Sequence, residues 1–260
     1  MKSHERRVEI LRLATTSGLA SVEELSTTLD VTASTIRRDL ALLTSQGKLA
    51  RTYGGVMSLE PHPEASLRQR VGEAYAAKRA IALWSSERIV DGETIALDAG
   101  STTGVLADLL RGFVHLTVVT AGLSAIETLA DAPGVDVIAL GGRLRSLSQA
   151  FVGPLAESSL ERLSFDRAFM GADAVRADRG ICEADLQQTR LKEMLMQRAE
   201  HTYVLAHAAK LGQAPFHAWA VMPPRWTLVT DRAATREQLD PFHAHGVEVV
   251  IADIAVDATA

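Results

Sequence analysis

The chain has a single cysteine and no long apolar run. Because one thiol cannot form an internal disulfide, and no metal-ligand spacing surrounds Cys182, we expect neither a disulfide framework nor a metal site. No stretch of 18 apolar residues is present, and the first residues lack the apolar core of a signal peptide. We therefore expect a cytoplasmic protein without membrane segments, and the residues indicate no cofactor.

An excess of basic residues is also missing overall, since the formal net charge is −5. The average conceals an asymmetry, because residues 1–57 hold eight Lys/Arg and six Asp/Glu, which leaves −7 for residues 58–260. Any contact with nucleic acid is therefore expected in the first part of the chain. With 47% hydrophobic residues, 260 residues suffice for one small and one mid-sized globular domain.

Three short helices are predicted in the first part of the chain. The first spans residues 6–16, ends before Gly18, and has as inward-facing residues Val8, Ile10, Leu11 and Ala14. The second begins with a capping box formed by Ser21 and Glu24 and ends near Asp30. Its apolar residues are Val22, Leu25 and Leu29.

The third helix carries the side chains that we expect to contact DNA. Thr32 is its predicted N-cap. At 100° per residue, one side packs inward through Ala33, Ile36, Leu40 and Leu43. Ser34, Arg37 and Arg38 fall on the opposite side or its flank, where a helix in a DNA major groove presents side chains to bases and phosphates. A solvated helix face is the alternative for such an arginine pair.

A small two-stranded wing is predicted after these helices, over residues 47–58 with a turn at Gly54 and Gly55. Three helices and a basic wing form a winged helix-turn-helix. The segments 31–40 and 51–55 resemble the DNA-binding signature of the DeoR/GlpR family of bacterial transcription regulators. The predicted DNA-binding residues are Thr32, Ser34, Thr35, Arg37, Arg38, Arg51, Tyr53 and Gly54.

Pro61 and Pro63 interrupt regular structure and predict a linker over residues 59–65, between a DNA-binding domain at 1–58 and a larger domain at 66–260. The larger domain starts with helix-forming sequence over 66–90, of which 78–84 is the most regular part. Apolar runs then alternate with amphipathic or Gly-rich segments. The runs lie at 94–98, 116–120, 135–140, 165–170, 202–206, 218–222, 227–230 and 247–251. This alternation predicts an α/β domain with a largely parallel sheet.

In such a sheet, ligands bind beyond the carboxyl ends of the strands. The first strand-end loop, residues 98–104, has a glycine, three hydroxyl residues and the start of a helix, which together suit an anion. It is neither a P-loop nor the Gly-x-Ser-x-Gly elbow of hydrolases. A plain capped helix after a strand is the alternative interpretation.

Further glycine loops and cations follow other runs, at 139–143, 169–173, 180–185 and 210–212, with Lys192 on a helix after the third of these loops. Together they could converge on a small phosphorylated, polyhydroxylated molecule, because cations bind phosphate and carboxylates accept from hydroxyls. Each feature alone is a common surface or turn feature.

In chain order, these segments also resemble the effector domain of the DeoR/GlpR family, so the resemblance covers nearly the whole chain. It implies a fold like that of ribose-5-phosphate isomerases and a phosphorylated sugar or polyol as effector. The implied phosphate-binding residues are Gly100, Ser101, Thr102 and Thr103. The implied residues that shape or line the pocket are Gly141, Gly142, Arg143, Asp98, Asp185, Lys192 and Lys210.

Two segments depart from the family pattern. Ala121 stands where the family usually has Asn, and residues 207–210 read His-Ala-Ala-Lys in place of Asp-Ser-Ser-Lys. Both changes remove polar groups expected near the ligand, which favours an atypical effector or weak binding. His207 could replace the lost hydrogen bond.

Three functions remain open from the residues. A transcriptional regulator, by resemblance a repressor of a sugar or polyol catabolic operon, would bind duplex operator DNA as a homo-oligomer, a dimer or tetramer, and would not be an enzyme. A sugar isomerase with a DNA-binding domain would need a carboxylate as general base, for which the candidates are Asp98, Asp173, Glu183 and Asp185. A domain that serves only for assembly is the third.

Overall fold

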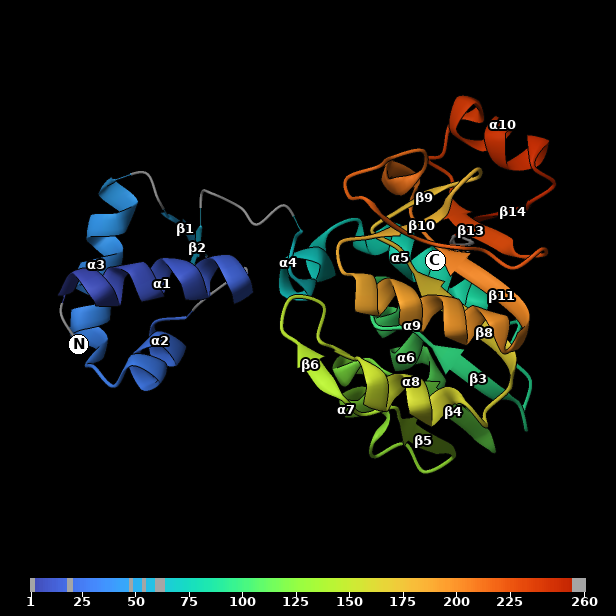
Figure 1. Cartoon of the computed structure of the whole chain (residues 1–260), viewed down its shortest axis with the longest axis horizontal. Helices are drawn as coiled ribbons and strands as arrows, with labels where there is room; N and C mark the ends of the chain where they lie inside the picture. The colour runs from blue at the N-terminus through green and yellow to red at the C-terminus, as the bar shows by residue number, and fades with distance from the viewer. Residues whose placement is uncertain (1–2, 18–20, 47–48, 53–54, 59–63, 254–260) are drawn as a thin grey trace, which may run out of the picture. The chain divides into compact units, whose positions relative to one another are not determined.

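A computed structural model of the chain describes residues 3–17, 21–46, 49–52, 55–58 and 64–253. The chain divides into two compact units, residues 1–73 and 74–260. Each unit is described by itself below, with the labels of Figure 1.

The first unit is a winged helix-turn-helix. Its elements are α1 (Ser3–Ser17), α2 (Val22–Leu29), α3 (Ala33–Ser45), β1 (Leu49–Thr52), β2 (Gly55–Ser58) and α4 (Leu67–Gly72). The predicted capping box is present, since Ser21 Oγ accepts from the backbone N–H of Glu24 and Glu24 Oε2 accepts from the backbone N–H of Ser21. Asp30 ends α2 in the left-handed conformation, at φ 50°. Strands β1 and β2 pair antiparallel and form the predicted wing.

The core of the first unit joins all three predicted helices to the wing. Its buried residues are Ile10, Leu25, Ile36, Leu40, Leu43 and Leu49. One predicted core position is wrong, because Val8 is 53% exposed. Helix α1 begins at Ser3 rather than Arg6, and Ile10, one half-turn beyond Val8, is the residue that the other helices cover. The side chain of Ala14 and residue Gly18 lie outside the described part of the chain.

The helix-forming segment after the linker contains two helices. Helix α4 starts with a capping box formed by Ser66 and Gln69, and α5 (Tyr75–Ser86) follows. Ala74, at φ 49°, breaks the helix between them. Within the second unit, α5 packs against α6 (Ser101–Leu110) and against the sheet.

A seven-stranded parallel sheet is the centre of the second unit, in the order β14-β13-β11-β8-β3-β4-β5. Its strands are β3 (Thr94–Leu97), β4 (Leu116–Thr120), β5 (Val135–Ala139), β8 (Phe165–Gly171), β11 (Ala199–Leu205), β13 (Thr227–Asp231) and β14 (Glu248–Ala252). Seven of the eight predicted apolar runs are these strands. They are apolar because helices cover both faces of the sheet.

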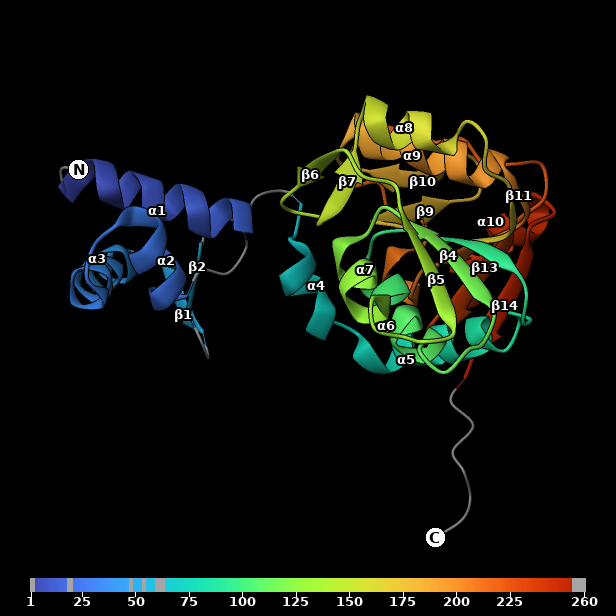
Figure 2. The same cartoon turned by 90° about the horizontal axis from the view of Figure 1, so that it is seen from below.

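The two faces carry separate sets of helices (Figures 1 and 2). Helices α5, α6 and α7 (Leu123–Leu129) cover one face, and α8 (Pro154–Leu160), α9 (Leu186–Gln197) and α10 (Arg236–Ala244) cover the other. Because β4 and β5 lie on one side of β3 and the later strands on the other, the strand order reverses between β3 and β8. At such a switch point an open sheet leaves a crevice beyond its strand ends.

Three features of the second unit differ from the predictions. The run at 218–222 gives β12 (Ala218–Ala220), which lies in a separate antiparallel sheet with β10 (Gly180–Glu183) and β9 (Ala174–Arg176). The segment predicted as a loop at 180–185 is therefore largely strand β10. A hairpin of β6 (Arg143–Arg145) and β7 (Ala150–Val152) was not predicted, because its strands are too short to show a period.

Candidate functional site

Helix α3 is the helix that the sequence predicts to contact DNA. Thr32 Oγ1 accepts from the backbone N–H of Thr35 at 3.3 Å, which confirms the predicted N-cap. The same oxygen lies 3.0 Å from the hydroxyl of Ser34 and 3.0 Å from that of Thr35. Side chains of Ile36, Leu40 and Leu43 are buried, whereas Ser34, Arg37 and Arg38 are exposed. The polar face of α3 is therefore exposed, as the sequence predicts.

An ion pair that the sequence did not reveal holds α3 against α1. Arg6 Nε lies 2.6 Å from Asp39 Oδ2, and their side chains are 13% and 7% exposed. Asp39 directly follows Arg38, so the pair fixes the rotation of the helix that presents both arginines.

The predicted wing contacts are only partly within the described chain. Arg51 lies in β1 and pairs with Val56 in register. The side chain of Arg51, and residues Tyr53 and Gly54, fall outside the described residues. Their role in DNA binding stays a prediction.

In the second unit, the switch point places Asp98 and Gly171 side by side. Asp98 directly follows β3, and Gly171 is the last residue of β8. Asp98 Oδ2 accepts from the backbone N–H of Gly171 at 2.9 Å. A Cβ at Gly171 would lie 3.3 Å from that oxygen, so a glycine suits this close approach.

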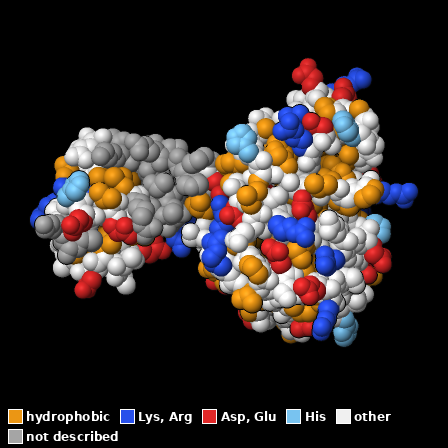
Figure 3. All heavy atoms as spheres, in the orientation of Figure 1, with side chains coloured by type: hydrophobic (Ala, Val, Ile, Leu, Met, Phe, Trp, Pro, Cys, Tyr) orange, Lys and Arg blue, Asp and Glu red, His pale blue; other side chains and the backbone are white. Residues whose placement is uncertain are grey.

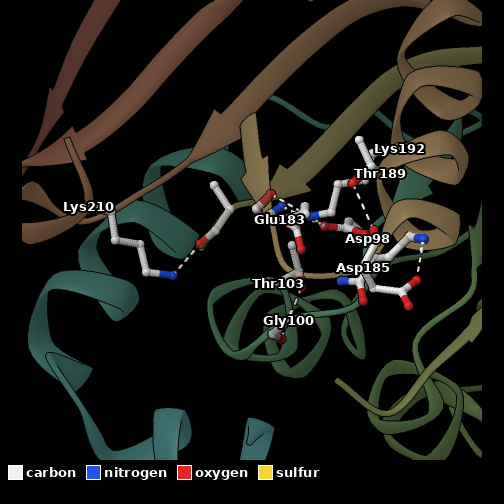
Figure 4. A network of polar contacts seen from close by, with 11 residues as sticks. Asp98, Gly100, Thr103, Glu183, Asp185, Thr189, Lys192 and Lys210 are labelled. Atoms are coloured by element: carbon white, nitrogen blue, oxygen red, sulfur yellow. Dashed lines mark hydrogen bonds and ion pairs between the residues drawn. The ribbon is translucent and has the colours of Figure 1, made fainter. Parts of the chain in front are cut away.

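A buried lysine lies between two carboxylates at this point (Figure 4). Lys192 Nζ, on α9, is 2.6 Å from Asp98 Oδ2 and 2.7 Å from Glu183 Oε1, and it donates to the Gly171 carbonyl at 2.7 Å. An ammonium has three protons, so these three acceptors engage all of them. Lys192 therefore neutralises and orients the carboxylates rather than offering a proton to an anion.

Burial raises the pKa of Glu183 to about 7, because the effect of desolvation outweighs the attraction of Lys192. The nearby carboxylates of Asp173 and Asp98 raise this pKa further. The two facing carboxylates raise the pKa of Lys192 against the effect of its burial. The lysine is thus charged, and the cluster is a dense, fully desolvated set of hydrogen-bonding groups.

A second lysine approaches the same backbone segment. Lys210 donates from Nζ to the carbonyl of Ala172, the neighbour of the residue that accepts from Lys192. In the view of Figure 4, Lys210 and Lys192 enter the network from opposite sides. The structure thus brings together three predicted effector residues, Asp98, Lys192 and Lys210.

The loop after β3 leads directly into the N-terminus of α6. Gly100 is the N-cap and has no side chain to satisfy the first backbone N–H groups of the helix. Ser101, Thr102 and Thr103 are buried, and Thr103 Oγ1 donates to the Gly100 carbonyl at 3.0 Å. Uncapped N–H groups at a helix start favour an anion. The predicted phosphate-binding residues therefore adjoin the cluster of Asp98.

The remaining predicted residues lie at the end of β5, at the start of β6 and at the start of α9. Gly142, at φ 109°, could not carry a Cβ without approaching the Val152 carbonyl to 2.9 Å, whereas a Cβ at Gly141, at φ 64°, would meet nothing within 4 Å. Arg143 donates to Gln187 Oε1 at 2.6 Å. Asp185 caps α9 by accepting from the backbone N–H of Gln188 at 2.9 Å. Arg143 and Asp185 thus join the hairpin to α9.

Sequence reasoning missed Arg145, which strengthens this connection. Its Nε lies 3.5 Å from Asp185 Oδ2, with side-chain exposures of 13% and 26%. Ala150 and Val152 of β7 pack on Ala99, within the loop after β3. The hairpin therefore packs on the loop after β3, and its three-residue strands are too short to give a signal in the sequence.

The two departures from the family pattern lie at buried or half-buried strand ends. Ala121 is 2% exposed, and its carbonyl accepts from the backbone N–H of Phe151. His207 makes no side-chain cap for the short helix that follows it. Desolvation, with the nearby Lys210 and Lys78, lowers the pKa of His207 to about 4, so the imidazole is neutral at pH 7.

Other site classes find no support within the described residues. No group of three or more His, Cys, Asp or Glu side chains there could hold a metal ion. None of the helices in those ranges combines the length and apolar character that a membrane crossing needs. Acidic and basic side chains are interspersed over the visible face of the second unit in Figure 3, rather than gathered into a block of one sign.

Comparison with known proteins agrees with the geometry. Residues 6–62 match the DeoR-like helix-turn-helix domain, and residues 73–232 match the DeoR C terminal sensor domain. A ribose-5-phosphate isomerase in complex with phospho-erythronic acid is similar over 51% of this chain and 52% of its own, with 19% identity and a TM-score of 0.39. A likeness at that level carries no inference.

Full-length relatives are more informative. The transcriptional regulator GlpR of Haloferax volcanii is 32% identical over 95% of this chain and 96% of its own length. The transcriptional regulator GolR of Listeria innocua is 31% identical over 96% of this chain and 98% of its own. A lactose phosphotransferase system repressor of Streptococcus mutans is 29% identical over 89% of this chain and 93% of its own length. These relatives are named as regulators and not as enzymes, and the chain belongs to the DeoR family of transcriptional regulators, with a helix-turn-helix domain and a sensor domain.

Proposed function

We propose that this regulator represses a sugar or polyol catabolic operon and that a phosphorylated sugar intermediate, bound by its sensor domain, weakens operator binding. The observation that carries the proposal is the convergence of the start of α6 with Asp98, Lys192 and Lys210 at the switch point of the sheet.

The phosphate group would bind at the start of α6. Backbone N–H groups after Gly100 and the hydroxyls of Ser101 and Thr102 supply donors, and the helix dipole favours negative charge there. Lys210, on the other side of the network, adds a cation near the same edge of the sheet.

The sugar hydroxyls would bind the carboxylates. Asp98 and Glu183 are buried and retain acceptor capacity beyond the bond each makes to Lys192, because a carboxylate has about four lone-pair directions. Lys192 lowers the cost of burying two acids, so the site can present acceptors to an uncharged hydroxyl beside a phosphate site.

At the DNA, α3 would enter the major groove and the wing would contact flanking phosphates. Ser34, Arg37 and Arg38 would face bases and phosphates, with Arg51 on the backbone. A homo-oligomer, a dimer or tetramer, would place such helices in successive grooves. The effector must bind the free and DNA-bound states with different affinity, and a coupling of about 1–3 kcal/mol is typical.

The test is a titration of the purified protein against duplex fragments from around its own gene, by fluorescence anisotropy at several salt concentrations. We expect a salt-sensitive preference for one fragment, lost on addition of one member of a panel of hexose, pentose and polyol phosphates. The unphosphorylated sugars and inorganic phosphate serve as controls. Failure of every fragment to bind, or of every phosphorylated compound to alter binding, contradicts the proposal. Product analysis on the same samples would detect an isomerase.

A further inference from the structure

One buried polar atom beside the candidate sensor site has no partner within the protein. The side-chain oxygen Oε1 of Gln188 is inaccessible and makes no hydrogen bond, and the residue is 4% exposed. Leaving such a group unsatisfied costs about 1–3 kcal/mol. Most buried polar groups in natural structures are hydrogen-bonded, so an unsatisfied one calls for an explanation.

The position of Gln188 links it to the ligand-facing cluster. It lies one helical turn before Lys192 on α9, on the same buried face, at an axial rise of about 6 Å. Lys192 reaches Asp98, the residue that opens the strand-end loop. The amide therefore belongs to the same side of α9 as the cation that holds both carboxylates.

The hairpin lies on the other side of Gln188. Helix α9 packs against β7, whose Ala150 and Val152 contact Ala99 in the strand-end loop. Asp185, which caps the turn containing Gln188, pairs with Arg145 of β6. Gln188 thus lies on the buried face of α9, the helix that carries Lys192 and packs against strand β7 of the hairpin.

We propose that Gln188 is a specificity-determining residue whose Oε1 accepts a hydrogen bond from a hydroxyl of the sugar or polyol moiety of the effector. The inference rests on the proposed function. An amide oxygen needs a donor, which a sugar hydroxyl supplies and a phosphate dianion does not. Gln188 therefore recognises the carbohydrate part of the ligand and leaves the phosphate to the start of α6.

The structure offers a matched control. Thr230 Oγ1, on β13, is also buried without a partner, and Thr230 is fully buried. Strand β13 is separated from β8 by β11, so Thr230 is not on the elements that adjoin Gln188. Gln188→Met and Thr230→Val each replace an unsatisfied polar group by an apolar one of similar size. Both variants should unfold at a higher temperature than the wild type in the absence of ligand.

The two variants should differ in their response to ligand. The probes are the phosphorylated sugar that shifts the wild type most, its unphosphorylated sugar and inorganic phosphate, each followed by thermal unfolding and calorimetric titration. We expect Gln188→Met to bind the sugar phosphate about 3- to 10-fold more weakly, the range that one lost hydrogen bond gives. Its affinity for inorganic phosphate should equal that of the wild type. Thr230→Val should bind both as the wild type does.

Equal affinity of Gln188→Met and the wild type for the sugar phosphate would overturn the inference while leaving the proposed function intact. If Gln188→Met does not fold, Gln188→Asn keeps the amide and withdraws it by one methylene. Weaker sugar phosphate binding by Gln188→Asn supports the inference, and unchanged binding overturns it. If no sugar phosphate shifts the wild type, the proposed function fails and the inference fails with it.

Discussion

Lys192 Nζ lies 2.6 Å from Asp98 Oδ2, although the two residues are 94 positions apart in the chain. This contact joins the helix after β10 to the loop after β3, across the point where the strand order of the sheet reverses. Lys192 also forms an ion pair with Glu183, so a single ammonium group fixes the positions of both buried carboxylates.

Replacement of Lys192 by Met should destabilise the sensor domain by about 3–5 kcal/mol, because two buried carboxylates would lose their cation. Chemical denaturation followed by circular dichroism measures the loss. Arg190→Met is the matched control, since Arg190 lies on the same helix with a 54% exposed side chain, and we expect a change within about 0.5 kcal/mol. Equal effects of both substitutions would contradict the structural role of Lys192.

Glu183 should make stability depend on pH in a defined direction. Its folded pKa of about 7 exceeds the ordinary value of 4.5, so the folded state binds more protons between these values and its stability falls as pH rises through that window. Glu183→Gln removes this dependence. The difference in unfolding free energy, variant minus wild type, should grow from about pH 4.5 to about pH 7 and then level off. A constant difference would show that Glu183 does not titrate there.

The ion pair of Arg6 and Asp39 should stabilise the DNA-binding unit. Arg6→Met and Asp39→Leu should each cost about 1–3 kcal/mol, because each leaves a largely buried partner unpaired. The double variant should cost less than the sum of the two, and the double-mutant cycle measures the coupling. Additive single effects would mean that the contact contributes nothing.

Arg38→Ala should weaken operator binding by about 1–3 kcal/mol if the guanidinium contacts a base, and should relax the preference at one operator position. Binding to a library of operator variants measures both quantities. A smaller loss that is uniform over all sequences would assign Arg38 to a phosphate. Arg37→Ala, on the same exposed face, provides the comparison.

Thr102→Glu should abolish the effector response and leave operator binding unchanged. The substitution puts a carboxylate at the start of α6, where it would occupy the place of a phosphate and repel it. Thr102→Ser keeps the hydroxyl and should respond as the wild type does. Anisotropy titrations with and without the sugar phosphate distinguish the two, and a full response by Thr102→Glu would place the phosphate elsewhere.

Local signals in the sequence were sufficient for much of the fold. The caps at Ser21 and Thr32, the apolar face of α3 and seven strands of the sheet follow from the side chains of a few consecutive residues. Val8 and the strand at 180–183 were misassigned because burial of Val8 depends on how α1 rotates against its partners, and β10 is strand only because β9 and β12 pair with it. The exact boundaries 1–58, 59–65 and 66–260 stay a prediction.

For the site, the sequence by itself determined which residue types stand at the strand ends, and hence the candidates Asp98, Lys192 and Lys210, because glycine, hydroxyl and charge patterns are local. Only the tertiary structure decided that Lys192 directs its protons to Asp98, Glu183 and Gly171, and that Gln188, one helical turn before Lys192, has a buried oxygen without a partner. Hydrogen-bond satisfaction depends on which distant segments are brought within about 3 Å, and no spacing along the chain encodes that distance.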